Sequence, residues 1–410
     1  MRRAEVESAR TISSATRVAG ELAVPGDKSI AHRALILAAL AQGESWIHGL
    51  PEGEDVLATV ACLRGLGANL QRSGRTTRIR GAGLSSFATP HGELDCENSG
   101  TTMRLLLGVL AGSSISATLD GDASLRRRPM DRVIEPLRTM GARIESRESR
   151  APVFVMGTSL QASGPTTVVE ATPTRDHTER LLRAMGTDVG ATADGVVVRP
   201  SHQPLRPIEL VIPGDFSSAA FWIAAAALRP GWSVIVGDVG LNPTRTAFLA
   251  LLRSMGAQVE VEGSSSDIEP RGMLTVTGQR LRAIVLGPAD VAAAIDEIPA
   301  LLVLATQAAG VTTIDGAGEL RVKESDRIAA MADGLRRMGA VVEERPDGVS
   351  VKGPTALHGA SVESHGDHRV AMALAVAALV ASGPTTIADA DCVAVSYPNF
   401  FTQLQELTHE

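Results

Sequence analysis

The amino-acid sequence predicts an α/β protein of two domains, each built from three repeated α/β units with buried helices and strands outside. Its 410 residues exceed what one hydrophobic core usually organises. A helix that ends in Met-Gly-Ala, or in a close variant, recurs five times, and a β-prone run follows each copy. Other helical stretches are apolar almost all round, which is typical of helices buried inside a domain.

The recurring helix ends mark the units in chain order. Each copy combines apolar residues at helical spacing with a glycine suited to the left-handed end of a helix. A further helix, from Phe400, ends the chain where the same pattern would stop. The five copies are LRGLGANL from Leu63, LRTMGARI from Leu137, LLRAMGTDV from Leu181, LLRSMGAQV from Leu251 and LRRMGAVV from Leu335.

Six units of this size divide into two domains of three. We expect one domain over residues 21–213 and the other over residues 1–20 and 214–410. The third unit is short, because Gly67 and Gly141 lie 74 residues apart but Gly141 and Gly186 only 45. A stretch of about 25 residues, enough for a helix and a strand, is therefore missing near residues 157–166.

Composition excludes several classes of function. Aromatic residues make up only 3% of the chain and its net charge is −7, which disfavours nucleic-acid binding. No stretch is apolar for the roughly 20 residues that a membrane span needs, and no secretory signal is evident. The three cysteines, Cys62, Cys96 and Cys392, have no metal-ligand spacing, so we expect reduced thiols, no metal and a cytoplasmic protein.

Two motifs in the first half favour anion binding at helix starts. In VPGDKSIAHRALILAALA, Lys28, Ser29 and Arg33 lie where helix N–H groups and the helix dipole attract an anion. Asp27 replaces the glycine that a nucleotide P-loop needs, and a capped surface helix with solvated charges remains the alternative. In ENSGTTMRLLLGVLAG, Gly100 permits close backbone approach to a ligand, although the segment is also an ordinary helix cap.

Charged residues in the remaining motifs also have two interpretations, as ligand-binding groups or as ordinary solvated or helix-capping residues. GDASLRRRPM carries three arginines, of which we expect at least two to be solvated. IDEIP places Asp296 before an apolar helix, where an acid also serves as a simple cap. ELRVKESDRI is the densest polar cluster, with Lys323, Glu324 and Arg327, and GDHRVAMA places Arg369 at another helix start.

Taken in order, these pieces resemble the motifs of the 5-enolpyruvylshikimate-3-phosphate (EPSP) synthase family, the 3-phosphoshikimate 1-carboxyvinyltransferases. The resemblance runs from about Arg17 to Leu407. The related enzyme that makes the muramic precursor has a catalytic cysteine in its loop, and GDASLRRRPM has none. The matching segments are PGDKSIAHRA, ENSGTTMRLLLGVLAG, GDASLRRRPM, TRDHTERLL, GDFSSAA, VGLNPTRT, IDEIP, ELRVKESDRI, GDHRVAMA and SYPNFF.

The resemblance implies a fold, a reaction and two substrates. The family fold consists of two inverse α/β-barrel-like domains with a ligand cleft between them. The family reaction adds the 5-hydroxyl of shikimate 3-phosphate to C2 of phosphoenolpyruvate, after protonation of C3, and then expels phosphate. It needs a base, a proton donor and several cations, but no metal or organic cofactor. We also expect a monomer that binds neither nucleic acid nor membrane.

The resemblance also assigns roles by position. Asp296 resembles the base at the hydroxyl, and Lys28 and Glu324 resemble the groups that move protons at the phosphoenolpyruvate carbons. We expect alanine at Lys28 or Arg327 to abolish turnover without unfolding the protein. The implied phosphoenolpyruvate ligands are Lys28, Gly100, Arg128, Arg327 and Arg369; the implied shikimate 3-phosphate ligands are Lys28, Ser29, Arg33, Thr174, Asp296 and Lys323.

One family motif, Ser-Ala-Gln-x-Lys-Ser, is missing between Leu160 and Ala162. In the family its serines and glutamine hold the shikimate phosphate and help to bind phosphoenolpyruvate. Three lost hydrogen bonds to charged groups cost on the order of 4–9 kcal/mol, about a thousandfold to a millionfold in affinity. Besides a working synthase, the sequence therefore leaves open a transferase with another acceptor alcohol and a non-catalytic binding descendant.

Overall fold

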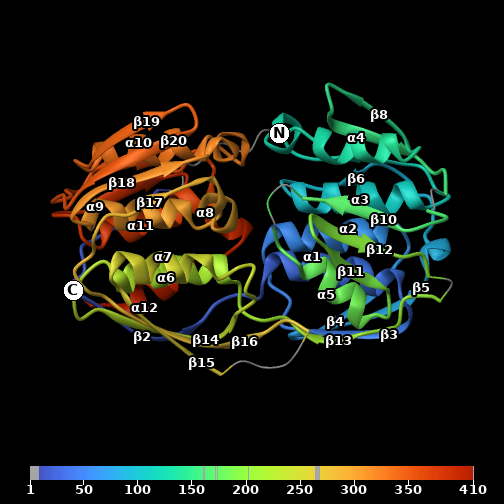
Figure 1. Ribbon diagram of the computed structural model, residues 1–410, viewed down its shortest axis with the longest axis horizontal. Coiled ribbons are helices and arrows are strands. Elements are labelled where there is room, and N and C mark those ends of the chain that lie inside the picture. The colour runs from blue at the N-terminus through green and yellow to red at the C-terminus, as the bar shows by residue number, and fades with distance from the viewer. Residues whose placement is uncertain are drawn as a thin grey trace. The chain divides into compact units, whose positions relative to one another are not determined.

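The computed structural model describes residues 9–159, 162–170, 172, 174–201, 203–263 and 268–409. Leu160, at the predicted deletion, lies outside these residues. The chain forms two compact units, shown in Figure 1. We call Pro25–Pro213 with Ile268 and Glu269 the N-terminal unit, and residues 9–24, 214–263 and 270–409 the C-terminal unit. The first boundary thus falls four residues after the expected one, and no sequence pattern predicted that Ile268 and Glu269 group with the N-terminal unit.

The C-terminal unit is built around three buried helices, α6 (Phe216–Ala227), α9 (Ile298–Gln307) and α11 (His368–Ala378), which contact one another. Every residue of α6 and α11 is buried, as their uniformly apolar sequences predict. Three sheets accompany them. Their strand orders are β15 (Gln258–Glu262), β16 (Arg271–Thr277), β14 (Ser233–Gly240), β2 (Arg17–Ala23), β23 (Thr408–His409); β17 (Val285–Leu286), β18 (Gly310–Asp315), β20 (Gly348–Gly353), β19 (Val341–Arg345); and β1 (Arg10–Ile12), β22 (Thr385–Ala388), β21 (Ser361–Glu363).

In the described part of the N-terminal unit there are two such inner helices, α1 (Lys28–Leu40) and α3 (Gly100–Gly112). Its three sheets have the strand orders β13 (Glu209–Val211), β3 (Gln42–His48), β5 (Thr76–Ala82), β4 (Asn69–Ser73); β6 (Leu94–Asp95), β7 (Ala117–Asp120), β9 (Arg150–Met156), β8 (Arg143–Arg147); and β10 (Thr166–Val169), β12 (Gly195–Val198), β11 (Val189–Thr192).

The predicted helix ends are confirmed. The repeated glycines Gly67, Gly141, Gly186, Gly256 and Gly339 all adopt positive φ, and a strand follows each of them. None of the described helices has the length and apolar character that a membrane crossing requires. The remaining helices are α2 (Glu54–Gly65), α4 (Asp131–Thr139), α5 (His177–Ala184), α7 (Ala247–Met255), α8 (Pro288–Ala293), α10 (Arg327–Arg337) and α12 (Phe400–Leu407).

The third sheet of the N-terminal unit differs from the other five described sheets. Each of those five contains a parallel strand pair, whereas β10, β12 and β11 pair antiparallel throughout. A parallel pair needs a crossover, which is usually a helix, as α3 is between β6 and β7. The described residues between β9 and β10 contain no helix, and the described part of this repeat shows neither a crossover helix nor a parallel strand pair.

Apolar side chains on β10 are exposed. Val168 and Val169 on β10 are 54% and 70% exposed, whereas Val153 and Val155 on β9 of the neighbouring sheet are fully buried. The inner helices α1 and α3 are also less covered than α6 and α11. Leu37, Leu40, Leu105 and Val109 are only partly buried.

The same substitution on the two sheets tests this difference. We expect Val155→Thr to lower the free energy of unfolding by roughly 1–3 kcal/mol, because it buries a hydroxyl in an apolar core. Val169→Thr should change it by less than about 0.5 kcal/mol, since the side chain is exposed and threonine suits a strand. Denaturant unfolding of both variants measures the difference, and an equal loss in both would show that β10 is covered.

Candidate active site

In the N-terminal unit, Lys28 is held at the start of α1. The Asp27 side chain caps the helix by accepting a hydrogen bond from the Ile30 N–H at 2.9 Å. The Lys28 ammonium lies 2.7 Å from an Asp55 carboxylate oxygen, and its side chain is 19% exposed. The pairing fixes the ammonium group at a helix start while leaving part of it accessible to an anion.

Ser29 and Arg33, on the same helix, contact residues at the start of α5. Arg33 donates from Nε to Thr178 Oγ1 at 2.8 Å and from Nη1 to the Ser29 carbonyl at 2.9 Å. Arg175 donates to Ser29 Oγ at 3.2 Å. Burial and the neighbouring charge of Arg175 lower the pKa of Arg33, so this place favours an anion.

The start of α3 brings Gly100 and Arg128 together. Arg128 is buried and donates to Asn98 Oδ1 at 2.5 Å, whereas Arg126 and Arg127 are exposed, as expected for two of the three arginines. A Cβ at Gly100 would lie 2.7 Å from Arg104 Nη1 and 3.4 Å from Arg128 Nη1. Glycine therefore allows a guanidinium group to lie against the helix N-terminus.

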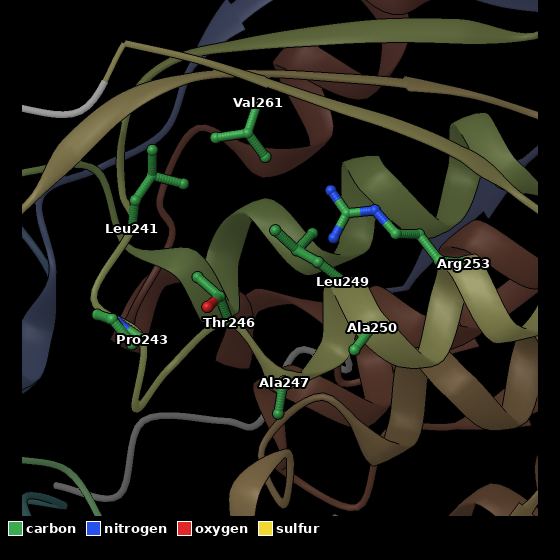
Figure 2. Close-up of a pocket in the computed structure, with 8 residues that line it drawn as sticks. All are labelled: Leu241, Pro243, Thr246, Ala247, Leu249, Ala250, Arg253 and Val261. Carbon is green, nitrogen blue, oxygen red and sulfur yellow. The ribbon is translucent and has the colours of Figure 1, made fainter.

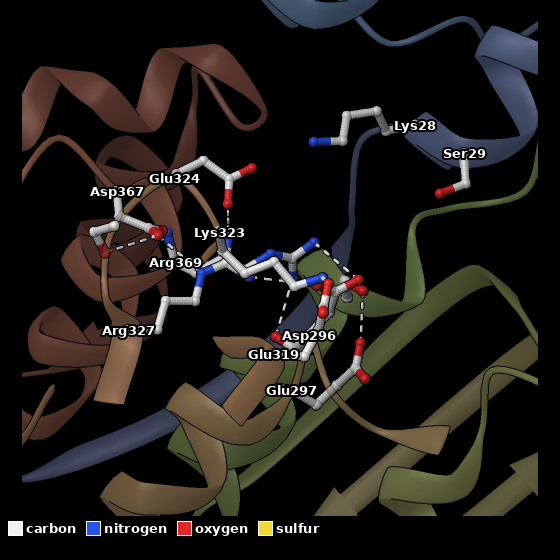
Figure 3. A network of polar contacts seen from close by, with 12 residues as sticks. Lys28, Ser29, Asp296, Glu297, Glu319, Lys323, Glu324, Arg327, Asp367 and Arg369 are labelled. Carbon is white, nitrogen blue, oxygen red and sulfur yellow. Dashed lines mark hydrogen bonds and ion pairs between the residues drawn. The ribbon is translucent and has the colours of Figure 1, made fainter. Parts of the chain in front are cut away.

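In the C-terminal unit, Arg327 is the centre of a charged network at the starts of α9, α10 and α11 (Figure 3). Its guanidinium lies 2.8 Å from Asp367, 2.5 Å from Glu324 and 3.4 Å from Asp296. Arg369 extends the network, donating to the Asp296 carbonyl at 3.1 Å and lying 3.7 Å from its carboxylate. We call Asp296, Glu324, Arg327, Asp367 and Arg369 the Arg327 network.

Burial and neighbouring charges have opposite effects on the pKa values of Arg327 and Asp367 in this network. The side chains of Arg327 and Asp367 are 2% and 0% exposed. Burial alone would lower the pKa of Arg327, but the charges of Asp367, Glu324 and Asp296 outweigh it, and the pKa is raised. Burial would raise the pKa of Asp367, but Arg327 reverses this and holds the pKa below its usual value. Both groups are therefore charged at neutral pH, whereas Asp296 and Glu324 remain partly exposed.

A second buried cluster lies close to Asp296 in sequence. Arg245 donates to Ser217 Oγ at 2.5 Å, and that hydroxyl donates to Glu297 at 2.5 Å. Glu297 and Arg245 are 0% and 4% exposed. The GDFSSAA and VGLNPTRT motifs thus form a buried hydrogen-bonded cluster with Glu297, the residue after Asp296. The described residues contain no group of three or more histidines, cysteines and acids arranged to hold a metal ion.

Two predicted ligands have other contacts. Lys323 pairs with Glu319 at 3.2 Å and is 25% exposed. Thr174 is exposed, and its hydroxyl donates to Glu170 at 2.8 Å. The structure thus groups Lys28, Ser29 and Arg33 on α1 and unites Asp296, Glu324, Arg327 and Arg369, but it places Thr174 on an exposed loop. Arg175 was not predicted, and its position in TRDHTERLL was the only signal.

A hollow of about 380 Å³ lies elsewhere in the C-terminal unit (Figure 2). It borders α7 and β15, and none of the predicted site residues lines it. Most of its lining is apolar, which does not suit small, multiply charged anions. The lining residues are Leu241, Pro243, Thr246, Ala247, Leu249, Ala250, Arg253 and Val261.

His32, one turn after Ser29, makes stability dependent on pH. Burial lowers its pKa from 6.5 to about 3, with Lys28 and Arg33 acting in the same direction and Asp55 against them. The unfolded chain therefore binds the proton more readily. This contribution to stability is complete above pH 6.5 and is lost as the pH falls toward 3.

We therefore expect the free energy of unfolding to decrease by up to about 1.4 kcal/mol per pH unit from this one residue between pH 6.5 and 5. His32→Gln should flatten that part of the profile while keeping a polar partner for Thr59, which lies 2.6 Å from His32 Nδ1. Urea unfolding at several pH values measures the slope. The same slope in both proteins would contradict the assignment.

Comparison with known proteins identifies relatives along the whole chain. The family model described as EPSP synthase (3-phosphoshikimate 1-carboxyvinyltransferase) matches residues 12–161 and 150–404. A 3-phosphoshikimate 1-carboxyvinyltransferase of Gloeobacter violaceus is 49% identical, over 98% of this chain and 99% of its own. One of Synechococcus sp. is 46% identical, over 97% and 96%. The solved EPSP synthase of Acinetobacter baumannii is 37% identical with a TM-score of 0.85, over 98% of each chain.

These alignments also bear on the predicted deletion. The alignment with the Gloeobacter violaceus relative spans 428 positions, more than the 410 residues of this chain. The relative therefore has residues without a counterpart here. The family model matches in two parts that overlap at residues 150–161, shortly before β10.

Proposed function

The chain belongs to the EPSP synthase (3-phosphoshikimate 1-carboxyvinyltransferase) family and is an enolpyruvyl transferase of the shikimate pathway, and we propose how its residues bind and convert the two substrates. The Arg327 network carries the proposal, because it holds two partly exposed carboxylates, Asp296 and Glu324, against one buried guanidinium. This combination provides charge for an anionic substrate and proton-transfer groups beside it.

Phosphoenolpyruvate has a phosphate and a carboxylate, and each needs a cation. Arg327 and Arg369 supply two guanidinium groups from the starts of α10 and α11. Lys28 and Arg128, with Gly100, supply the others from the starts of α1 and α3. Arginine binds carboxylate and phosphate in a bidentate manner, and the helix N-termini add partial positive charge.

Asp296 is proposed to accept the proton of the 5-hydroxyl as that oxygen attacks C2. Its carboxylate is 14% exposed and lies 3.4 Å from Arg327 and 3.7 Å from Arg369, two cations beside the proposed base. Glu324 and Lys28 are proposed to deliver a proton to C3 and to recover it as phosphate leaves. No step needs a metal or an organic cofactor.

Shikimate 3-phosphate binding is proposed to depend on Ser29, Arg33, Lys323 and the newly found Arg175. The two guanidinium groups beside Ser29 suit the phosphate or the carboxylate of this substrate. Thr174 contributes only if its hydroxyl leaves Glu170. Without the serines and glutamine of the missing segment, we propose that this substrate binds weakly. We also take the chain to act as a monomer.

The test is phosphate release from phosphoenolpyruvate with and without shikimate 3-phosphate, beside calorimetric binding of each ligand. Release that requires shikimate 3-phosphate supports the proposal. Binding of phosphoenolpyruvate alone would indicate a different acceptor alcohol, and binding of neither would indicate a non-catalytic descendant. Lys28→Ala should lose turnover with an unchanged circular dichroism spectrum, and near-native activity in that variant would refute its assigned role.

A further inference from the structure

A buried hydrogen bond outside the predicted site joins α5 to a segment from a distant part of the sequence. His177 Nδ1 and Glu269 Oε1 lie 2.8 Å apart, and both side chains are 1% exposed. Glu269 lies between β15 and β16 of the C-terminal unit, yet it groups with the N-terminal unit. Its neighbour Ile268 packs against the core of the N-terminal unit and accepts a hydrogen bond from Arg180 at 3.4 Å.

The pair is adjacent to the groups proposed to bind shikimate 3-phosphate. His177 is the first residue of α5 and lies between Arg175, which contacts Ser29, and Thr178, which contacts Arg33. α5 is only eight residues long, and the side chain of its N-cap residue, Asp176, makes no capping hydrogen bond. A short helix without a side-chain cap gains little stability of its own, so its position depends on tertiary contacts.

The charge of Glu269 also connects it with the two arginines proposed to bind the substrate. Arg33 and Arg175 are like charges close together, and the carboxylate of Glu269 is one of the groups whose charge opposes the lowering of the Arg33 pKa. A buried carboxylate at this place offsets part of the repulsion between the two guanidinium groups.

We propose that His177 and Glu269 are positioning residues, which hold the start of α5 so that Arg175, Ser29 and Arg33 together bind shikimate 3-phosphate. This inference rests on the proposed function of the same site. The pair does not touch the substrate in this proposal. It acts through Arg175 and Thr178. Glu269, which lies between two strands of the C-terminal unit in the sequence, is therefore needed for a binding site in the N-terminal unit.

The test compares Glu269→Leu, which removes the hydrogen bond, with Glu269→Gln, which keeps an acceptor of the same size. We expect the leucine variant to raise the dissociation constant for shikimate 3-phosphate at least tenfold and to speed amide hydrogen exchange in α5. The glutamine variant keeps the hydrogen-bond acceptor but loses the charge, so its dissociation constant should rise by clearly less than that of the leucine variant. Phosphoenolpyruvate binding should change less than twofold in both. Glu262→Gln, at an exposed position of β15, is the matched control.

Three outcomes would overturn the inference. They are faster exchange in α5 with unchanged shikimate 3-phosphate binding, unchanged exchange in the leucine variant, and an equal loss of binding in the leucine and glutamine variants. If Glu269→Leu does not fold, His177→Phe removes the same hydrogen bond from the other side. All variants are also made in a chain into which a segment with the family motif Ser-Ala-Gln-x-Lys-Ser is inserted. If the chain without the insertion binds no shikimate 3-phosphate, that result counts against the proposed function alone. The variants in the chain with the insertion still test the role of His177 and Glu269.

Discussion

Arg327→Ala is expected to abolish measurable turnover and to lower the free energy of unfolding by about 3–5 kcal/mol. The first effect follows from the loss of a buried cation proposed to hold phosphoenolpyruvate, and removal of one such group costs at least about a hundredfold in rate. The second follows from Asp367, which is 0% exposed and would remain as a buried charge without its guanidinium partner. Steady-state phosphate release and denaturant unfolding measure the two effects.

The matched control for this variant is Arg337→Ala on the same helix. Arg337 is 51% exposed and pairs with Asp333, four residues earlier, so its removal should change stability by less than about 0.5 kcal/mol and leave turnover unchanged. From the sequence alone we expected Arg327→Ala to leave the protein folded; the buried position of Asp367 adds the expectation that the folded protein is less stable. If Arg327→Ala is as stable as the native chain, the expected loss of stability is wrong.

The architecture could be predicted because its signals are local. A glycine one or two residues beyond an apolar helix, as at Gly256 and Gly339, needs no distant partner to adopt positive φ. The uniformly apolar composition of α6 and α11 likewise determines their burial without knowledge of their neighbours. The short third repeat was visible as spacing, and the loss of a parallel strand pair follows from the loss of its crossover.

The missed parts of the site depend on contacts between residues far apart in the chain. Arg175 meets Ser29 across 146 positions and Glu269 meets His177 across 92, and no periodicity connects such residues. Among three consecutive arginines, only Arg128 is buried, because Asn98 provides an acceptor 30 positions earlier. The position of Thr174 in a motif suggested a ligand, but a nearby carboxylate, Glu170, already binds its hydroxyl.

Insertion of the missing segment is expected to strengthen shikimate 3-phosphate binding by about a thousandfold to a millionfold. The segment carries the family motif Ser-Ala-Gln-x-Lys-Ser with a helix and a strand, and it is placed between Ser159 and Thr166. It restores three hydrogen-bonding side chains to a charged phosphate, each contributing roughly 1.5–3 kcal/mol. It also provides a helix to cover β10, where Val169 is 70% exposed, so the thermal midpoint should rise. Calorimetry and thermal unfolding measure the two effects.

An insertion in which the two serines and the glutamine are replaced by alanine separates binding from packing. This control should raise the thermal midpoint as the unaltered insertion does, because its helix covers the same apolar surface, but it should not strengthen binding. If the alanine-bearing insertion binds shikimate 3-phosphate as tightly as the unaltered one, the gain comes from repacking α1 and α5 and not from the serines and glutamine. If the native chain already binds as tightly as either, Ser29, Arg33 and Arg175 suffice, and the deletion does not weaken the site.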